Sequence, residues 1–265
     1  AEDNHILLTR DGWVKRQREI KDPAATRLRE GDSVLSVVAG STKATVVFFS
    51  TYGTAYTCRI ADVPATTGYG EPIQKLFKMK DGESIIAMAS LDPRLVGKLA
   101  GDEEHYPETY AVAASSDGNG LTFGLEAFVE PSTRSGRRYA RLSEGKVIIG
   151  VEIVKGDETV IVVSKKRRAL LCDVSEVKYL ASAGKGVLLM KLADDDELLA
   201  MKAAKDDRDT IVVKTTLGGE QRINTGRYEK TGRGGKGREV ITRGAFTEVV
   251  LEPPAAPEPF STDGK

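Results

Sequence analysis

Short apolar runs broken by polar turns recur along the chain and set the first expectation about its fold. In each copy a β-rich run leads through a turn, usually with glycine, into a second short run, as in Ile6–Val14. Valine, isoleucine, phenylalanine and tyrosine around an Asp-Gly or Tyr-Gly turn are typical of a β-hairpin. The pattern therefore predicts five hairpins. They lie in Asn4–Ile20, Thr45–Val63, Thr109–Val129, Thr159–Val177 and Thr210–Tyr228.

A further apolar strand follows each hairpin after a loop that holds glycine or acidic residues. Successive hairpins start 41, 64, 50 and 51 residues apart, and the long interval holds an insertion near Leu91–Pro107. A period near 50 residues with four strands per unit is typical of a propeller-like ring, in which neighbouring units cover each other's faces. We therefore expect an all-β domain over residues 1–251 and a Pro-rich tail over 252–265. The five four-stranded blades are expected near residues 4–40, 45–90, 109–153, 159–204 and 210–251.

Composition adds little to this picture. Lys and Arg number 39, as do Asp and Glu, so the net charge is zero and only the distribution of charge can indicate a nucleic-acid partner. No apolar run approaches the roughly 18 residues of a membrane span, and the N-terminal residues lack the features of a signal peptide. Cys58 and Cys172 lie far apart in strand-like runs, which favours a reducing compartment. We expect a cytoplasmic protein without a membrane partner.

The loop after the last hairpin, residues 231–237, reads Thr-Gly-Arg-Gly-Gly-Lys-Gly. Glycine allows another chain to approach the backbone closely, and exposed amides beside Arg233 and Lys236 can bind successive phosphates. The loop also fits the dinucleotide pattern G-x-G-x-x-G, but the 28 residues after it hold no βαβ unit. A P-loop is excluded because Arg238 and Glu239 stand where lysine and serine or threonine are required. A flexible, solvated loop is the alternative that the residues leave open.

Basic residues gather in turns and in the loops between predicted blades, at recurring positions of the repeat. Acidic residues cluster elsewhere, in 102–104, 194–197 and 206–209. Such segregation would give a neutral protein a positive rim, although each cluster alone is also consistent with a solvated surface. The chain shows no recognition helix and no aromatic platform for single strands, so we expect contacts to the phosphates of duplex DNA without sequence reading.

Two motifs resemble the C-terminal domain of the A subunit of bacterial type IIA topoisomerases, the family of DNA gyrase and topoisomerase IV. Leu8–Arg16 is similar to the family's blade opening, and Arg233–Gly237 is similar to the core of the gyrase A box. The box departs from the family pattern at Thr231 and Gly232, which stand in place of glutamine and a basic residue. It also follows the last hairpin, whereas the loop Lys21–Glu30 after the first hairpin has no glycine. The resemblance covers nearly the whole chain.

The resemblance implies a β-pinwheel, in which neighbouring blades exchange strands, and a domain that bends or wraps double-stranded DNA and presents it to the DNA gate. It implies two partners, which are the ATPase subunit of the enzyme and the remainder of the A polypeptide. ATP and magnesium would belong to the parent enzyme, and no cofactor or metal is expected in this domain, which we expect to be monomeric. The expected DNA-binding residues are the box, Arg233, Gly234, Gly235, Lys236, Gly237 and Arg238, together with Lys15, Arg16, Arg18, Arg134, Arg137, Arg138, Arg141, Lys165, Lys166, Arg167, Arg168, Lys185, Arg222, Arg227 and Lys230.

Two other functions remain open at this point. A propeller-like module could bind another protein without DNA. A β-propeller enzyme would need converging acid–base residues, but His5 and His105 lie 100 residues apart and no cysteine or histidine stands at ligand spacing. No catalytic residue is predicted. Five blades favour a topoisomerase IV-like domain, and the box favours a gyrase-like one. An open ring and a closed ring are both consistent with the sequence.

Overall fold

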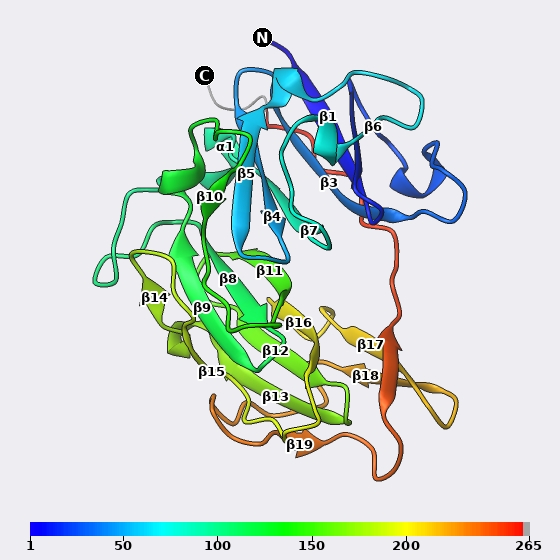
Figure 1. Ribbon diagram of the computed structural model, residues 1–265, viewed down its shortest axis with the longest axis vertical. Helices are drawn as coiled ribbons and strands as arrows, with labels where there is room; N and C mark the ends of the chain where they lie inside the picture. Colours follow the sequence, from blue (N-terminus) through cyan, green and yellow to red (C-terminus); the bar gives the residue numbers. More distant parts are fainter. Residues whose placement is uncertain (262–265) are drawn as a thin grey trace.

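The computed structural model describes residues 1–261, and all five predicted hairpins form in it (Figure 1). The first strand of the three middle hairpins is buried along its whole length, because sheet neighbours flank it and adjacent sheets cover its faces. Continuous apolar runs suit such strands. The hairpins are β1 (Asp3–Thr9) with β2 (Trp13–Gln17), β4 (Thr45–Ser50) with β5 (Thr54–Arg59), β8 (Tyr110–Ser115) with β9 (Asn119–Gly124), β12 (Thr159–Ser164) with β13 (Arg168–Asp173), and β17 (Ile211–Thr215) with β18 (Glu220–Ile223).

A third strand pairs antiparallel with the first strand of each hairpin and completes the inner part of each sheet. Consecutive third strands contact one another, so they form the inner side of an arc that runs from blade 1 to blade 5 (Figure 1). The predicted all-β blades are confirmed. The third strands of blades 1 to 5 are β3 (Val34–Ser41), β7 (Ile85–Ser90), β11 (Ile148–Val154), β16 (Leu198–Ala204) and β20 (Phe246–Val249).

The outer strand of blades 1 to 4 comes from the chain that follows the next blade's hairpin, so neighbouring blades exchange strands. We call the four donor stretches, 64–78, 131–141, 179–191 and 228–241, the exchange segments. Their strands are β6 (Glu71–Pro72) beside β2, β10 (Arg137–Arg138) beside β5, β14 (Tyr179–Leu180) and β15 (Val187–Leu188) beside β9, and β19 (Arg238–Glu239) beside β13.

Helical structure is limited to single turns. The 3-10 turns η2, η4 and η5 follow the second strand of the three middle hairpins and turn the chain toward the neighbouring blade. The insertion contains a four-residue helix, α1 (Pro93–Val96), which begins at the N-cap Asp92. The 3-10 turns are η1 (Pro23–Ala25), η2 (Ile60–Asp62), η3 (Ile73–Lys75), η4 (Glu126–Phe128) and η5 (Val174–Glu176).

Blade 5 differs from the prediction of four strands, since its sheet has three strands in the order β18-β17-β20 among the described residues. A closed ring would need the loop after β2 to supply the missing strand. That loop instead packs on its own blade: Leu28 contacts the cluster of Leu7, Ile20 and Val34, and Lys15 Nζ donates a 2.8 Å hydrogen bond to the carbonyl of Arg27. Strand exchange therefore does not close the ring within residues 1–261.

The segment after β20 crosses the gap between blade 5 and blade 1 (Figure 1). It leaves blade 5 where the amide of Val250 donates a 2.7 Å hydrogen bond to the carbonyl of Val212. It reaches blades 1 and 2 at Phe260, whose ring centroid lies 3.6 Å from the guanidinium carbon of Arg94. The predicted Pro-rich tail, 252–265, is thus partly placed, and its last four residues, 262–265, lie outside the described residues.

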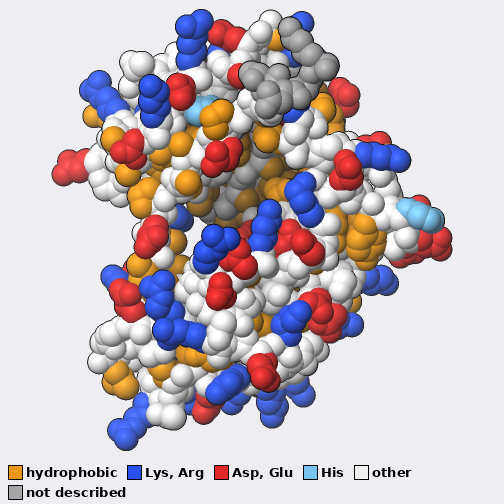
Figure 2. Space-filling view, turned by 180° about the vertical axis from the view of Figure 1, so that it is seen from behind, with side chains coloured by type: hydrophobic (Ala, Val, Ile, Leu, Met, Phe, Trp, Pro, Cys, Tyr) orange, Lys and Arg blue, Asp and Glu red, His pale blue; other side chains and the backbone are white. Residues whose placement is uncertain are grey.

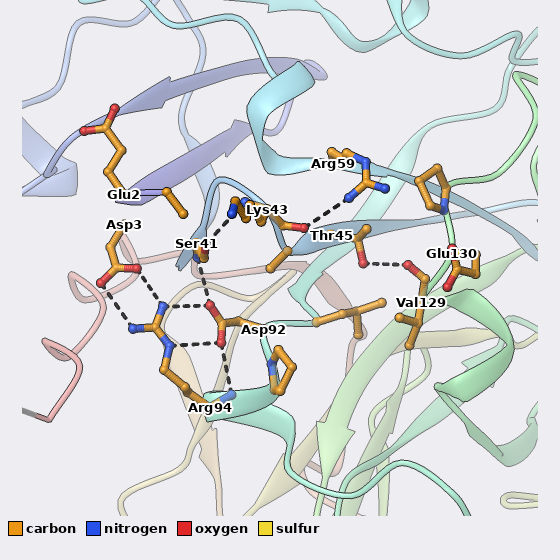
Figure 3. A pocket seen from close by; sticks show the side chains of 15 residues that line it. Glu2, Asp3, Ser41, Lys43, Thr45, Arg59, Asp92, Arg94, Val129 and Glu130 are labelled. Atoms are coloured by element: carbon orange, nitrogen blue, oxygen red, sulfur yellow. Dashed lines mark hydrogen bonds and ion pairs between the residues drawn. The ribbon is translucent and has the colours of Figure 1, made fainter. Parts of the chain in front are cut away.

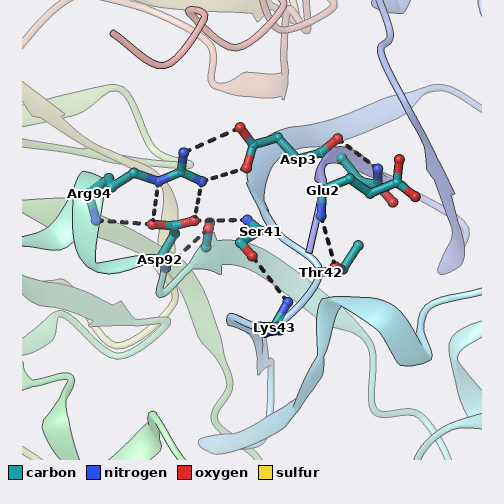
Figure 4. A network of polar contacts seen from close by, with 9 residues as sticks. Glu2, Asp3, Ser41, Thr42, Lys43, Asp92 and Arg94 are labelled. Carbon is teal, nitrogen blue, oxygen red and sulfur yellow. Dashed lines mark hydrogen bonds and ion pairs between the residues drawn. The ribbon is translucent and has the colours of Figure 1, made fainter. Parts of the chain in front are cut away.

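Arg94 joins blades 1 and 2 through two carboxylates (Figure 4). Its Nη2 lies 2.6 Å from Oδ1 of Asp3 and 2.8 Å from Oδ2 of Asp92. Burial by itself would raise the pKa of Asp92, but hydrogen bonds from Arg94 and from the amide of Ser41 outweigh it and lower that pKa. The carboxylate of Asp92 therefore stays ionised and fixes the position of the guanidinium on which Phe260 stacks.

Glu152 on β11 makes the stability of the fold depend on pH. Its Oε2 accepts a 2.9 Å hydrogen bond from the amide of Ala203 on β16, across the boundary between blades 3 and 4. Burial raises the pKa of Glu152 to about 7, against smaller lowering effects of that amide and of Lys202. The unfolded chain loses this proton near pH 4.5, so stability from this group is present below that pH and is lost as the pH rises to about 7.

We predict that Glu152→Gln removes part of the difference in unfolding free energy between about pH 5 and pH 8, on the order of 2 kcal/mol. The glutamine carbonyl can still accept the bond from Ala203 but carries no proton to lose. Urea denaturation at both pH values would measure the change. Glu144→Gln, at an exposed turn position, is the control. An unchanged pH dependence in Glu152→Gln would contradict the assignment.

Candidate nucleic-acid interface

Each exchange segment enters its neighbouring blade through a glycine with positive φ, between +73° and +90°. A Cβ at any of these glycines would lie within 2.8 Å of the carbonyl oxygen of a residue in the second hairpin strand. These positions therefore need glycine for both backbone conformation and space. The four matched contacts are Gly70 over Val14, Gly136 over Ala55, Gly186 over Gly120 and Gly237 over Ala169. The box glycine Gly237 is thus one member of a set of four.

The exchange segments are hydrogen-bonded to one another in order around the outside of the blades. An amide of each segment donates to a carbonyl of the next segment, two residues before that segment's glycine. We call the continuous outer edge that results the rim. The three links are Lys78 to Arg134 at 2.8 Å, Arg141 to Gly184 at 3.0 Å and Lys191 to Gly235 at 2.8 Å.

The box loop lies on the outer edge of blade 4, against blade 3. The amide of Gly234 donates a 2.6 Å hydrogen bond to the carbonyl of Leu189, and Arg168 Nη1 donates a 3.0 Å bond to the carbonyl of Gly237. Arg233 holds the loop from within, since its Nε and Nη1 donate to the carbonyls of Glu176 and Leu188 at 2.9 and 3.2 Å. The arginine of the box is therefore engaged in internal hydrogen bonds.

The amides of Gly235 and Lys236 form no hydrogen bond with any residue from 1 to 261. Both residues are exposed, and nothing lies within 4 Å of the place where a Cβ of Gly235 would be. Two free amides beside an exposed ammonium group form an arrangement that can bind a phosphate.

Exposed cations recur along the rim on blades 2, 3 and 4 (Figure 2 shows Lys and Arg side chains along the lower edge, where blade 4 lies). Four of them, Arg138, Lys185, Lys191 and Lys236, have no side-chain hydrogen bond or ion pair within the described part of the chain. Three more are exposed but already make one contact each, and these are Arg134, Arg141 and Arg238. The arrangement brings these seven cations to one outer edge, together with Lys78 of the first exchange segment, which is exposed and has no described side-chain contact.

Lys191 belongs with Lys185 to one of the basic clusters of the sequence but was not among the predicted site residues. It stands five residues after Gly186, as Arg141 stands five after Gly136. Alignment of the segments on their glycines would have revealed it. The same position in the first segment is Lys75, which forms a 2.7 Å ion pair with Glu71.

The cationic turn of blade 4 is neutralised, which corrects the expected separation of acids from bases. Lys165 pairs with Glu197, and Lys166 pairs with Asp195, whose pKa this contact lowers. Arg167 and Arg168 both approach Glu239, at 3.5 and 3.6 Å. The acidic stretch 194–197 therefore lies against the basic turn, because β16 pairs with β12.

Other predicted DNA contacts serve the fold. Lys15 is 1 % exposed, and its ammonium group donates to the carbonyls of Arg27 and Gly68, so it cannot reach DNA. Arg16 donates to Asn4 and to two carbonyls, and Arg137 donates to three carbonyls. The remaining predicted cations are exposed but are not among the free cations of the rim. Arg18 is paired with Glu2, and Lys230 is paired with Asp173. Arg222 and Arg227 lie near blade 5 without a described partner.

Two hollows help to place the site. One, of about 420 Å³, lies between Lys191, Lys236 and the turn 166–168, and the carboxylates of Asp196 and Glu239 also line it. The larger one, of about 740 Å³, lies beside the Arg94 cluster at the blade 1–2 junction (Figure 3). No histidine or cysteine lines it, and residues 1–261 contain no cluster of side chains suited to a metal.

We predict that Arg233→Ala and Lys236→Ala weaken DNA binding in different ways. Lys236→Ala removes one phosphate contact and lowers the log–log salt slope by about 0.9. Arg233→Ala removes the bonds that hold the loop, so its affinity loss should come with faster amide exchange across residues 232–237. Salt titration and hydrogen exchange separate the two. Equal salt slopes and equal exchange in both variants would contradict these roles.

Comparison with known proteins now identifies the family. The family described as "DNA gyrase C-terminal domain, beta-propeller" matches residues 44–92, 109–155 and 158–205, more than half of the chain. The chain belongs to this family. The match covers the hairpins and third strands of blades 2, 3 and 4 and ends before the box loop.

Curated relatives agree with this assignment. The chain is 26 % identical over 248 residues to the gyrase A protein of Haloquadratum walsbyi, covering 89 % of this chain and 28 % of the relative. It is 24 % identical over 247 residues to the gyrase A protein of Rickettsia bellii, covering 86 % and 26 %. The chain therefore spans just over a quarter of the length of these relatives.

Solved structures share the fold. The C-terminal domain of DNA topoisomerase IV aligns with a TM-score of 0.79 at 19 % identity, over 95 % of this chain and 78 % of that one. The E. coli ParC C-terminal domain gives 0.72 at 18 %, over 96 % and 100 %. The DNA gyrase A C-terminal domain gives 0.62 at 20 %, over 95 % and 83 %. In residues 1–261 no helix has the length and apolar character needed to span a membrane.

Proposed function

We propose that this domain binds duplex DNA along the rim of blades 2 to 4 and bends it, as part of the A polypeptide of a type IIA topoisomerase. The observation that carries the proposal is the chain of hydrogen-bonded exchange segments, which presents the seven exposed cations named above on the outer edges of blades 2 to 4. Membership of the gyrase C-terminal domain family supports it.

The chemistry of the rim suits phosphates better than bases. Lysine and arginine side chains and free amides contact the DNA backbone and carry no sequence information. None of the described elements is a helix long enough to enter the major groove, since α1 has four residues. Binding should therefore be insensitive to sequence.

A curved row of cations can offset the cost of bending. Bending a site of 20–30 base pairs by 40–90° costs about 1–6 kcal/mol, and contacts beyond the first blade form only if the DNA follows the arc. The cations on blades 2, 3 and 4 are spread over three successive edges, so each added edge favours further bending. In the parent enzyme this would guide DNA toward the gate, and ATP and magnesium would be used by other parts of that enzyme.

The test is a salt titration of binding to two unrelated duplexes. With seven phosphate contacts, the slope of log affinity against log salt should be about −6 for both duplexes. Absence of binding at low salt, or a strong preference for one sequence, would refute the proposal. Ligation of nicked plasmid in the presence of the domain would then show whether the bend also wraps DNA with a fixed handedness.

A further inference from the structure

Blade 5 has an outer edge with the geometry that the other blades use to accept an exchange segment. The five hairpin tips align along the chain, and the fourth residue of each has positive φ. These residues are Gly12 (+86°), Gly53 (+80°), Gly118 (+92°), Arg167 (+67°) and Gly218 (+90°). The tip of blade 5 therefore shares this positive-φ residue with its four counterparts, and it differs from them at the next residue, Gly219, which also has positive φ (+80°).

In blades 1 to 4 the carbonyl of that tip residue accepts a hydrogen bond from the incoming segment. The donors are the amides of Ile73 to Gly12, Tyr139 and Ala140 to Gly53, Leu189 and Met190 to Gly118, and Val240 to Arg167. In blade 5 the carbonyl of Gly218 receives only the hydroxyl of Thr215 among the described residues. One acceptor of the repeat is thus left without its amide.

The strand positions match in the same way. In blades 1 to 4, one residue of the second hairpin strand pairs with the first residue of an outer strand and faces a glycine of the exchange segment. These residues are Val14, Ala55, Gly120 and Ala169. Glu220 holds this position in blade 5, since it pairs with Lys214 as Ala169 pairs with Val163. No residue from 1 to 261 pairs with the other side of β18. An exposed strand edge with no partner is a site for strand addition.

The surroundings of this edge are also open. Leu217 at the tip is 72 % exposed, whereas the matching tip positions hold Asp11, Tyr52, Asp117 and Lys166. Nothing lies within 4 Å of a Cβ placed on Gly218 or Gly219, although a Cβ on Gly12 would touch Ile73 and one on Gly53 would overlap Ala140. The residue of the exchange segment that covers the tip in blades 1 and 2 has no counterpart here.

We infer that β18 is a docking site for an extended peptide segment of a partner protein, which adds to blade 5 as an antiparallel outer strand. The four exchange segments show which sequence the β18 edge would accept, because all four read Gly-x-x-apolar. They run from Gly70 to Ile73, Gly136 to Tyr139, Gly186 to Leu189 and Gly237 to Val240. The first x faces Glu220, so lysine or arginine fits there by cross-strand charge pairing.

The charge pairing has a precedent in blade 4, where Glu239 of the exchange segment pairs across the strands with Arg168 and lies 3.6 Å from it. The occupant is therefore a segment of the form Gly-(Lys or Arg)-x-apolar. This inference does not depend on DNA binding, because the β18 edge lies outside the exchange segments.

A labelled peptide with the sequence of residues 133–142, which contains Gly136-Arg137-Arg138-Tyr139, tests it on the full chain. Fluorescence anisotropy should show saturable binding, and hydrogen exchange should slow at residues 218–222. The same peptide with Gly136→Val cannot adopt the positive φ and should bind about tenfold more weakly. Glu220→Lys in the chain should weaken binding of the original peptide, and an Arg137→Glu peptide should restore it.

That exchange of charges separates edge docking from general attraction between a basic peptide and the protein. Absence of binding up to about 1 mM, or equal binding of the Gly136→Val peptide, would overturn the inference. Self-association of the chain that Glu220→Lys abolishes would also overturn it, because a second copy would then fill the edge.

Discussion

Replacement of Lys185, Lys191 and Lys236 with alanine will lower the affinity for duplex DNA by two to three orders of magnitude at about 0.1 M salt. Each lysine is exposed and lies on the rim of blade 3 or blade 4, and its ammonium group has no described partner. Each neutralised phosphate releases close to one counterion, so three lost contacts should also reduce the salt slope by about 2.7. Anisotropy titrations over a range of salt would measure both.

The matched control removes three other exposed lysines, Lys43, Lys98 and Lys205, which lie outside the exchange segments. It changes the net charge by the same amount, so attraction to the protein as a whole would weaken equally in both triple variants. We expect the control to lose less than about tenfold in affinity. Equal losses in the two variants would show that net charge, and not the rim, accounts for binding.

The second large effect concerns the glycine that seats β15. Gly186→Ala should destabilise the domain by about 3 kcal/mol or more. The added Cβ would lie 1.9 Å from the carbonyl oxygen of Gly120, and the backbone at Gly186 has a φ of +80°. Backbone atoms on both sides cannot move apart without opening the β9–β15 pairing. Urea denaturation would give the loss of unfolding free energy.

Gly235→Ala is the control for this change, since it lies in a neighbouring exchange segment but has open space around it and no positive φ. Its unfolding free energy should stay within about 0.5 kcal/mol of the unchanged chain. If Gly186→Ala were equally mild, the exchange segment would be loosely attached, and the rim would not be a rigid row of cations.

The hairpins could be predicted from the sequence because their signals are local. Apolar β-rich runs and a turn glycine specify β4 and β5 within fifteen residues. The exchange strands could not be derived this way, since β6, β10, β15 and β19 have two residues each and carry no periodic signal. Their partners are set by long-range contacts at a glycine, and only the family resemblance implied them.

The cations show the same limit. Arg137 and Arg138 are neighbours in sequence, but in β10 they point to opposite sides, so one binds three carbonyls and the other is free among the described residues. The pairing of Lys165 with Glu197 follows from the register of Ser164 with Leu198, which is visible only once β12 and β16 are known to pair. The clusters were predictable, and their partners required the fold.

The central claim is that DNA follows the rim and bends over blades 2 to 4. Ring closure of a linear fragment of about 150 base pairs tests it most directly, because a fragment near the persistence length closes slowly unless a protein bends it. At saturating protein we predict that ring closure is at least tenfold faster with the unchanged chain and with the control variant at Lys43, Lys98 and Lys205. The variant at Lys185, Lys191 and Lys236 should not accelerate ring closure. No acceleration by the unchanged chain, or equal acceleration by the rim variant at equal occupancy, would contradict the account.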